Sequence, residues 1–482
     1  MKRIEELIFY QRQQTPDKLA LSDSVNKLSY GQMWDHVCKA ENQLKEKGME
    51  KGELVALSMP NNVEAVVSFL AILKAGGIVM LLHNELTEAE VDTYFSIQSP
   101  NWLWKASSLT NITKEKPILP VRQVNALSDL FLFGFTSGST GRPKGFVKSH
   151  YSWSSSFQEW SDIFSLEQHD KVVVPLHISY SAQLYPVLHA LCSGMHAIML
   201  EAFTPWAVFN KEASCMSITP ALISPLLRYI QSRPKEKRLL PKTMISVGNK
   251  LSPSVRKKFS QAFPNAYLYE YYGSSEMGFV TVLSPHTAET IPNTVGYPVN
   301  SVDVLILNEH GKEVEKGDKG TLFVKTNQAF EGFVNDSEET NRSFFNGYVT
   351  SHDIAIQLQD GSITIVGRDK NVIKSSGSLV YAEEIEELLL QIPGVSEAAV
   401  FSVADDDRSE VVGAAIVLEN ISLSDVRQAL TQRVSAYKIP RIWRVLTSFP
   451  RMKNGKIDKA TIYSYFTEKE GKTYDLICTY YS

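Results

Sequence analysis

Residues 136–145, with the sequence TSGSTGRPKG, combine glycines, hydroxyl side chains and a lysine in one short segment. Glycines let the backbone approach a ligand closely and adopt positive φ, and hydroxyls and exposed N–H groups can donate to phosphate oxygens. Lys144 adds a point charge suited to a β- or γ-phosphate. The spacing fits neither G-x-x-x-x-G-K-[ST] nor G-x-G-x-x-G, and alone the segment also suits a polar surface turn. The residues predicted to contact a polyphosphate are Thr136, Ser137, Gly138, Ser139, Thr140, Gly141 and Lys144.

A second segment, residues 271–276 (YYGSSE), joins two aromatic rings, two hydroxyls and a carboxylate. The oxygens of Glu276 are hard ligands of the kind that Mg²⁺ prefers. Tandem aromatic residues on their own more often indicate packing in a core. The segment therefore predicts a metal ligand, Glu276, beside an aromatic pair that either binds a ligand or is buried.

These two segments resemble signature motifs of the adenylate-forming superfamily, which includes acyl-CoA synthetases, peptide-synthetase adenylation domains and firefly-type luciferases. The family's Y-G-x-T-E segment packs an aromatic ring on adenine, places a hydroxyl on the α-phosphate and binds Mg²⁺ through its carboxylate. By this resemblance those roles fall to Tyr272, Ser275 and Glu276, with serine in place of the commoner threonine. Residues 246–251 (SVGNKL) resemble, more loosely, the glycine-rich turn that lines the adenine pocket. The nucleotide-binding residues implied in this part of the chain are Gly248, Asn249, Tyr271, Tyr272, Gly273 and Ser275.

Two further segments resemble the family's ribose-binding motifs. Residues 347–353 (GYVTSHD) stand where the family has W-x-x-T-G-D, and Asp353 aligns with the aspartate that holds the ribose hydroxyls. Ser351 and His352 depart from the pattern, in which threonine and glycine are usual. His352 is interpreted either as a contact in the ribose site or as a tolerated loop residue. Arg368 matches the family's Gly-Arg pair, whose arginine contacts the ribose.

The C-terminal part of the chain resembles the family's mobile domain. Residues 450–456 (PRMKNGK) resemble P-x-x-x-x-G-K, so that Lys456 is the lysine that enters the site for the first half-reaction only. A cation between carboxylate and α-phosphate stabilises developing charge and orients two anions that repel each other. An exposed basic turn is the alternative, because Asn-Gly is a common hairpin signal. Lys370 stands at the family's interdomain hinge, and Gly377 aligns with a glycine beside the tunnel for the pantetheine arm of CoA.

Strand and helix patterns indicate how these residues are positioned. Residues 55–59 and 78–82 predict strands and residues 61–74 a helix between them, an order that favours parallel sheets covered by helices. From about residue 296, short alternating runs separated by turn formers predict antiparallel hairpins. We therefore expect an α/β fold. Residues 1–368 form a large N-terminal adenylation domain of two parallel-rich, helix-covered sheets plus a small β-barrel, and residues 369–482 form a small, mobile α+β lid domain carrying Lys456.

Composition excludes several other classes of protein. A formal net charge of −4 over 482 residues is too balanced for nucleic-acid binding. The four cysteines are scattered without a C-x-x-C pair, which predicts no zinc site, no disulfide framework and a cytoplasmic setting. The most apolar stretch, residues 66–82, is interrupted by Lys74 and by two glycines, so no membrane span is expected. We expect a monomer or homodimer.

The resemblance implies an enzyme that uses ATP and Mg²⁺ to activate a carboxylic acid and then transfers it to CoA. The acid pocket is predicted to include residues 175–194, with His177 and Tyr180 as polar candidates. This stretch offers no charged side chain that suits an amino acid's ammonium group, so a medium- or long-chain fatty acid is favoured.

Three alternatives remain open at this point. One is a ligase for an aryl acid of the succinylbenzoate type, and another is a stand-alone adenylation enzyme that loads a carrier protein. The third is a catalytically silent binding homologue, which has no chemical need to keep all of Lys144, Glu276, Asp353, Arg368 and Lys456.

Overall fold

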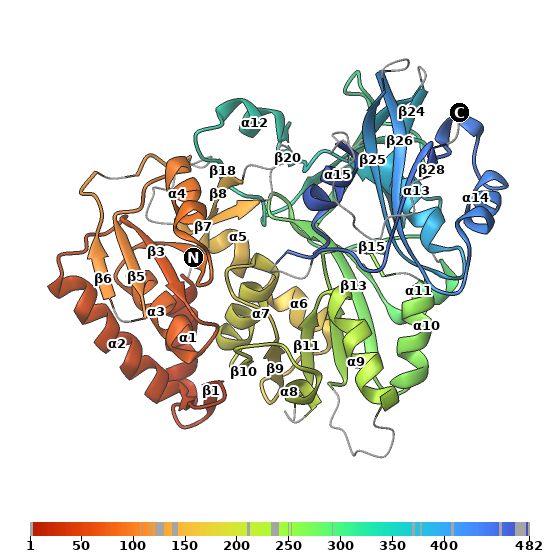
Figure 1. The fold of residues 1–482 in the computed structure, drawn as a ribbon. Coiled ribbons are helices and arrows are strands. Elements are labelled where there is room, and N and C mark those ends of the chain that lie inside the picture. Colours follow the sequence, from red (N-terminus) through yellow and green to blue (C-terminus); the bar gives the residue numbers. More distant parts are fainter. Residues whose placement is uncertain are drawn as a thin grey trace.

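The protein is described here from a computed structural model. It describes residues 3–106, 108–115, 117–120, 130–136, 143–209, 213–232, 241–248, 250–251, 253–291, 293–368, 372–375, 378–405, 409–452, 456–467 and 479–480. Three sheets and their helices make up the larger, N-terminal part, and a smaller part whose elements begin at Val372 lies above α10 and α11 (Figure 1). The helices outside that smaller part are α1 (Ile4–Gln14), α2 (Tyr30–Glu46), α3 (Val63–Lys74), α4 (Glu88–Ile97), α5 (His150–Ser154), α6 (Phe157–Phe164), α7 (Ser181–Cys192), α8 (Pro205–Phe209), α9 (Pro220–Ser232), α10 (Pro253–Ala262), α11 (Pro285–Thr290) and α12 (Ser337–Arg342).

The first sheet contains the strands that flank the predicted phosphate loop. In spatial order its described strands are β18 (Gly332–Phe333), β8 (Lys144–Ser149), β7 (Leu130–Thr136), β4 (Ile78–His83), β3 (Leu54–Met59), β5 (Trp102–Lys105) and β6 (Ser108–Asn111). The expected strand–helix–strand unit is confirmed: β3 and β4 pair in parallel and α3 connects them. Helix α3 begins after Asn62, whose side chain accepts from the N–H of Ala65.

The second sheet is mostly parallel and supports the opposite side of the site. Its described strands, in order, are β15 (Tyr297–Pro298), β14 (Gly278–Leu283), β13 (Tyr267–Ser274), β12 (Thr243–Ser246), β11 (Cys215–Ile218), β9 (Lys171–Val174), β10 (His196–Met199), β1 (Leu19–Ser22) and β2 (Lys27–Ser29). The pairs from β13 through to β1 run parallel. Their carboxyl ends therefore meet at one edge, where ligands bind in open α/β sheets.

The third sheet is antiparallel and corresponds to the region predicted as hairpins. It contains β19 (Phe344–Phe345), β20 (Tyr348–Val349), β17 (Lys319–Lys325), β21 (Asp353–Gln357) and β22 (Ile363–Arg368), with β16 (Asp303–Leu307) paired to β17. β21 begins at Asp353, and in its ladder with β22 the backbone of Asp353 is the direct partner of Arg368.

The C-terminal part is the expected small α+β unit. Its elements are β23 (Val372–Ser375), β24 (Ser378–Tyr381), α13 (Ala382–Leu390), β25 (Val395–Asp405), β26 (Ser409–Leu418), α14 (Leu423–Thr431), a 3₁₀ turn (Ala436–Lys438), β27 (Ile442–Leu446), α15 (Lys459–Thr467) and β28 (Thr479–Tyr480). Ser422 caps α14 by accepting from the N–H of Asp425.

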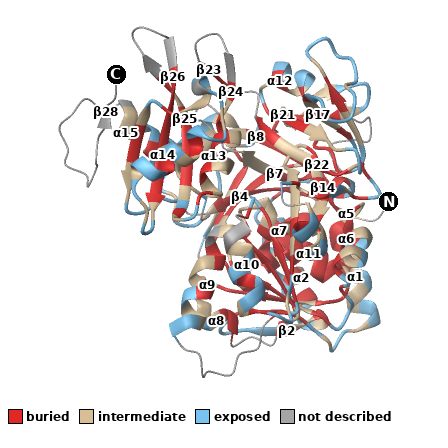
Figure 2. Cartoon of the chain, turned by 90° about the vertical axis from the view of Figure 1, so that its right-hand side faces the viewer, coloured by how far each residue is buried: buried red, intermediate tan, exposed pale blue. Residues whose placement is uncertain are grey.

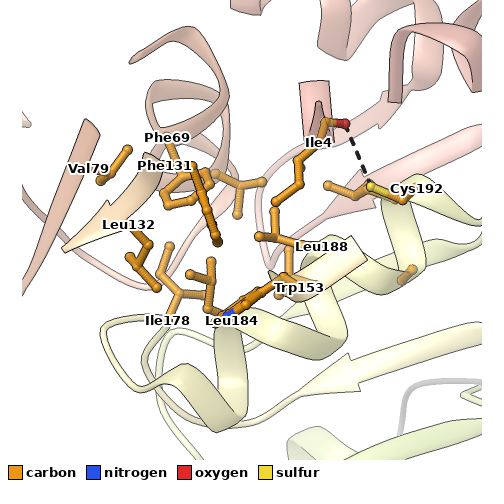
Figure 3. Close-up of a cluster of buried hydrophobic side chains, with 14 of the residues drawn as sticks. Ile4, Phe69, Val79, Phe131, Leu132, Trp153, Ile178, Leu184, Leu188 and Cys192 are labelled. Atoms are coloured by element: carbon orange, nitrogen blue, oxygen red, sulfur yellow. Dashed lines mark hydrogen bonds between the residues drawn. The ribbon is translucent and has the colours of Figure 1, made fainter. Parts of the chain in front are cut away.

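Separate apolar cores hold these units together. Buried residues line the strands and the facing sides of the helices in both parts of the molecule (Figure 2). Phe131 of the first sheet and Phe69 of helix α3 meet Leu184 and Leu188 of α7 in a shared cluster (Figure 3). The C-terminal part has its own core around Ile385, Leu430 and Trp443. An independent core of this kind is what a unit able to move as a body needs.

Candidate active site

The predicted phosphate loop lies where β7 and β8 form an antiparallel pair, with Thr136 directly opposite Lys144. Lys144 opens β8 and is half-buried. Its Nζ lies 3.0 Å from Oδ2 of Asp336 and 3.5 Å from Oε1 of Glu339, and it stands 5.3 Å from the centre of the Phe333 ring. The hairpin therefore places the predicted lysine against an acidic turn. The other predicted phosphate contacts, Ser137, Gly138, Ser139, Thr140 and Gly141, lie outside the described residues.

The two acidic partners of Lys144 did not figure among the predicted site residues. Asp336 caps α12 by accepting from the N–H of Glu339, and Glu339 is 8% exposed. A Ser/Thr/Asp/Asn residue followed three positions later by Glu is a helix-start signal, so the sequence does predict this short helix. It gives no sign that the helix lies beside Lys144, because residues 144 and 336 come together only through the pairing of β8 with β18.

The predicted ribose residues meet at the end of β13 and the start of β21. The Tyr272 hydroxyl donates to Oδ2 of Asp353, and the Ser351 hydroxyl donates to the same oxygen at 2.7 Å. Asp353 is buried, and the backbone of Arg368 is paired with it in the ladder. Two neutral donors on one buried carboxylate fix its orientation, and a carboxylate is an acceptor suited to a ligand hydroxyl.

Tyr271 and Tyr272 point to opposite sides because successive residues of a strand alternate. Tyr271 packs edge-on against Trp160 and Phe279, each at a ring-centroid distance of 5.3 Å. Burial among these rings raises the pKa of the Tyr271 hydroxyl. The two tyrosines predicted as an aromatic pair therefore have different surroundings. Tyr272 faces Asp353, whereas Tyr271 packs in an aromatic core, and we leave Tyr271 out of the proposed nucleotide site.

The end of β13 requires a glycine, Gly273, and the turn after the strand presents a carboxylate. A Cβ atom on Gly273 would lie 2.0 Å from the carbonyl oxygen of Gly278, so no larger residue fits there. Ser275 and Glu276 in this turn are partly exposed, and the carbonyl of Glu276 accepts from the N–H of Phe330. Among the described residues, none bonds to the Glu276 carboxylate. A partly exposed carboxylate held by its backbone and available for a cation fits a Mg²⁺ ligand, since Mg²⁺ is usually held by one or two carboxylates together with substrate phosphates.

Lys456 reaches the site from the C-terminal part. Its carbonyl accepts from the N–H of Met452 at 2.9 Å, and Arg451 and Ile457 form an antiparallel bridge beside this pair. Gly248, just after β12, has φ +102°, and a Cβ atom there would lie 3.4 Å from Cε of Lys456. The predicted catalytic lysine and the predicted adenine-pocket glycine are therefore neighbours. Asn249 lies outside the described residues.

Ion pairs join the two parts of the molecule in this pose. Lys250 Nζ lies 2.8 Å from Oε1 of Glu387 on α13. Lys319 Nζ lies 4.0 Å from Oε2 of Glu384 and stands 5.0 Å from the centre of the Tyr381 ring. These contacts hold α13 against the N-terminal part while Lys456 lies at Gly248. The predicted hinge residue Lys370 and the predicted tunnel residue Gly377 lie outside the described residues.

The two residues predicted for the acid pocket differ in their surroundings. His177 is buried, with Nε2 donating to the carbonyl of Met59 and Nδ1 accepting from the N–H of Ser179. Burial lowers the pKa of His177 to about 4, so it is neutral near pH 7. Because both ring nitrogens are used within the chain, we do not carry His177 forward as an acid contact. Tyr180 remains partly exposed near His83, at a ring-centroid distance of 6.1 Å.

Among the described residues, no three His, Cys, Asp or Glu side chains converge as a metal cluster. None of the helices in the same residues is both long and apolar enough to cross a bilayer.

Comparison with known families finds two matches that together cover most of the chain. The family model described as AMP-binding enzyme matches residues 8–96 and 92–334. The model described as AMP-binding enzyme C-terminal domain matches residues 384–456.

Among curated proteins, the chain is 28% identical to an uncharacterized acyl–CoA ligase of Bacillus subtilis, YhfT, covering 94% of this chain and 96% of that one. It is 25% identical to the long-chain-fatty-acid–CoA ligase FadD13 of Mycobacterium tuberculosis, covering 90% and 92% of the two chains. Among solved structures, ATP-bound MatB from Rhodopseudomonas palustris has a TM-score of 0.84 at 24% identity, covering 97% of this chain and 99% of that one. At this identity the structural likeness shows the fold alone.

Proposed function

The chain belongs to the AMP-binding enzyme family, and on that premise we propose that it is an ATP-dependent carboxylate–CoA ligase. In the first half-reaction the acid's carboxylate attacks the α-phosphorus of ATP, giving an acyl-adenylate and pyrophosphate. In the second, the thiol of CoA attacks the acyl carbon, giving an acyl-CoA and AMP. The observation that carries the proposal is the approach of Lys456 to Gly248, close to the end of the sheet that presents Tyr272 and Glu276.

For the first half-reaction we assign a role to each described residue. Lys144 contacts the distal phosphates, and Asp353, oriented by Tyr272 and Ser351, accepts from the ribose hydroxyls. Lys456 lies between the two reacting anions, where its charge stabilises the transition state and offsets their repulsion. Glu276 is the residue that would hold Mg²⁺, which when bound neutralises phosphate charge.

For the second half-reaction we propose that the C-terminal part rotates about Lys370, with the domain boundary after residue 368. The rotation removes Lys456 and brings Gly377 to the path of the pantetheine arm, where a side chain would block a thin ligand. Surface ion pairs are weak, so Lys250–Glu387 and Lys319–Glu384 can break and re-form in each cycle. A loose interface suits a motion of this kind.

A medium- or long-chain fatty acid is our first candidate for the acid. Residues 175–194 carry no Asp, Glu, Lys or Arg, and a pocket without charges favours an apolar tail over a polar one. Relatives of the chain include proteins named long-chain-fatty-acid–CoA ligase, which supports this choice, and others named oxalate–CoA ligase, which keeps smaller acids in the comparison.

The test is pyrophosphate release measured over fatty, aryl, dicarboxylic and amino acids, each with and without CoA. We expect release with a fatty acid and an acyl-CoA product when CoA is present. The matched control is Gly377→Leu, which should release pyrophosphate once per enzyme and form no thioester. Turnover that requires a carrier protein instead of CoA would assign the chain to carrier loading, and no release with any acid would refute the proposal.

A further inference from the structure

A line of polar groups connects the phosphate end of the site to its ribose end. Oε1 of Glu339 lies 3.5 Å from Nζ of Lys144 and 4.0 Å from Nε2 of His352. One carboxylate oxygen therefore faces both the lysine and the histidine. His352 directly precedes Asp353 in the chain, so the line ends at the carboxylate that Tyr272 and Ser351 orient.

His352 occupies its place at an energetic cost. Its φ is +61°, in the left-handed region where a side chain with a Cβ is disfavoured relative to its usual conformation. The buried Thr350 fixes this turn, because its hydroxyl accepts from the N–H of His352 and donates to the carbonyl of Leu322. Strain at a non-glycine residue beside a functional site is a reason to look for what its side chain does.

The charges around Glu339 suggest that role. Glu339 is buried, and its cationic or imidazole neighbours include Lys144, Arg342 at 3.9 Å, and His352. Arg342 is largely exposed, so water screens its charge. When Lys144 turns toward the phosphates of ATP, Glu339 loses the less exposed of these two cations. The loss of a cation is unfavourable for a buried carboxylate whatever else it contacts, and so Glu339 competes with ATP for Lys144.

We propose that His352 is a positioning residue for ATP binding, which engages the Glu339 carboxylate and so makes Lys144 available to the phosphates of ATP. This inference rests on the proposed function, since it assigns Lys144 to ATP. It acts through Glu339 and does not require His352 to touch the nucleotide.

The test is a double-mutant cycle between His352→Gly and Glu339→Gln, measured by titration calorimetry with Mg·ATP and by steady-state kinetics. Glycine relieves the strain at φ +61°, so His352→Gly should melt no lower than the natural protein. We expect it to raise Kd and KM for ATP about three- to tenfold, the range of coupling between contacting residues, with kcat at saturating ATP unchanged. His352→Asn, which tolerates the left-handed region but is shorter, should behave in the same way.

In the Glu339→Gln background, where the competing charge is absent, His352→Gly should leave Kd for ATP unchanged. An equal loss of affinity in both backgrounds would overturn the proposal, because His352 would then act without Glu339. So would an unchanged Kd in the single variant, or a fall in kcat with constant KM. Failure of the natural protein to bind ATP at all is a separate result, which refutes the proposed function itself.

Discussion

Lys456 and Gly248 lie against each other although they belong to different parts of the chain: a Cβ atom at position 248 would be 3.4 Å from Cε of the lysine. Gly248 follows a strand of the large parallel sheet, and Lys456 sits on a turn of the C-terminal part. The contact is what we expect of the pose proposed for adenylate formation. It also gives a direct way to separate the two half-reactions.

Lys456→Ala should abolish pyrophosphate exchange while sparing thioester formation from a supplied acyl-adenylate, because the lysine is needed at the site in only one pose. Removing a single group that stabilises developing charge typically lowers the rate by about 10²- to 10³-fold. The two half-reactions are measured separately, by exchange of labelled pyrophosphate and by CoA consumption. An equal loss in both would contradict domain alternation.

Tyr272→Phe should raise KM for ATP about five- to tenfold with little change in kcat, because the hydroxyl orients the Asp353 carboxylate. A hydrogen bond to a charged group is worth roughly 1.5–3 kcal/mol, and Ser351 retains part of the orientation. The measurement is initial rate against ATP concentration. Tyr269→Phe is the matched control, since Tyr269 lies on the same strand and packs on Phe164; a similar rise in KM there would point to a general loosening of β13.

Glu276→Gln should shift the Mg²⁺ dependence of pyrophosphate release to higher concentration and lower the maximal rate. An amide oxygen carries no net charge and is a weaker ligand for a hard cation than a carboxylate oxygen. The test is a Mg²⁺ titration at fixed ATP for both proteins. If Glu276→Gln changes the maximal rate but not the Mg²⁺ concentration at half-maximum, the residue is not the metal ligand.

Glu387→Ala should slow adenylate formation about two- to fivefold and leave the thioester half-reaction unchanged or faster, because it removes the Lys250–Glu387 pair that favours the observed pose. The expected two- to fivefold effect follows from the free energy that an exposed ion pair contributes, roughly 0–1 kcal/mol. Lys250→Ala should have the same effect and add nothing to Glu387→Ala. The control is Lys45→Ala, which breaks a pair with Glu41 within the N-terminal part; slowing of adenylation by that variant would count against an interdomain effect.

The N-terminal helix gives a prediction for stability against pH. Burial raises the pKa of Glu5 from 4.5 to about 7, against the opposing charge of Arg3. A carboxyl whose pKa is raised by folding contributes stability that is complete below pH 4.5 and is lost as the pH rises to about 7. This shift corresponds to a change on the order of 3 kcal/mol.

The unfolding free energy of the natural protein should therefore fall between pH 4.5 and pH 8. Glu5→Gln should remove this fall. Denaturant unfolding at several pH values measures it, and Glu6→Gln, an exposed change on the same helix, is the control. Parallel pH profiles for Glu5→Gln and the natural protein would show that Glu5 does not titrate in this range. Burial lowers the pKa of His150 to about 3, so this residue makes the unfolding free energy rise with pH. The histidine is present in both proteins.

The sequence alone determined which residues could do chemistry and most of the local structure. The strand over residues 55–59 and the helix ending at Lys74 are both confirmed, because they depend on neighbours within a few positions. The family was also readable from the motifs around Lys144, Tyr272 and Lys456, since these are short and contiguous. The domain boundary, the hinge at Lys370 and the tunnel at Gly377 stay predictions.

Only the tertiary structure decided which of those residues meet. Tyr271 and Tyr272 face opposite sides of their strand, and the Tyr271 ring packs in an aromatic core. Both ring nitrogens of His177 form hydrogen bonds within the chain. The tertiary structure brought Glu339 between Lys144 and His352, and Lys456 to Gly248, through strand pairings and ion pairs that join distant segments. Such contacts depend on packing over the whole chain, and no local pattern around residue 144, 248 or 339 encodes them.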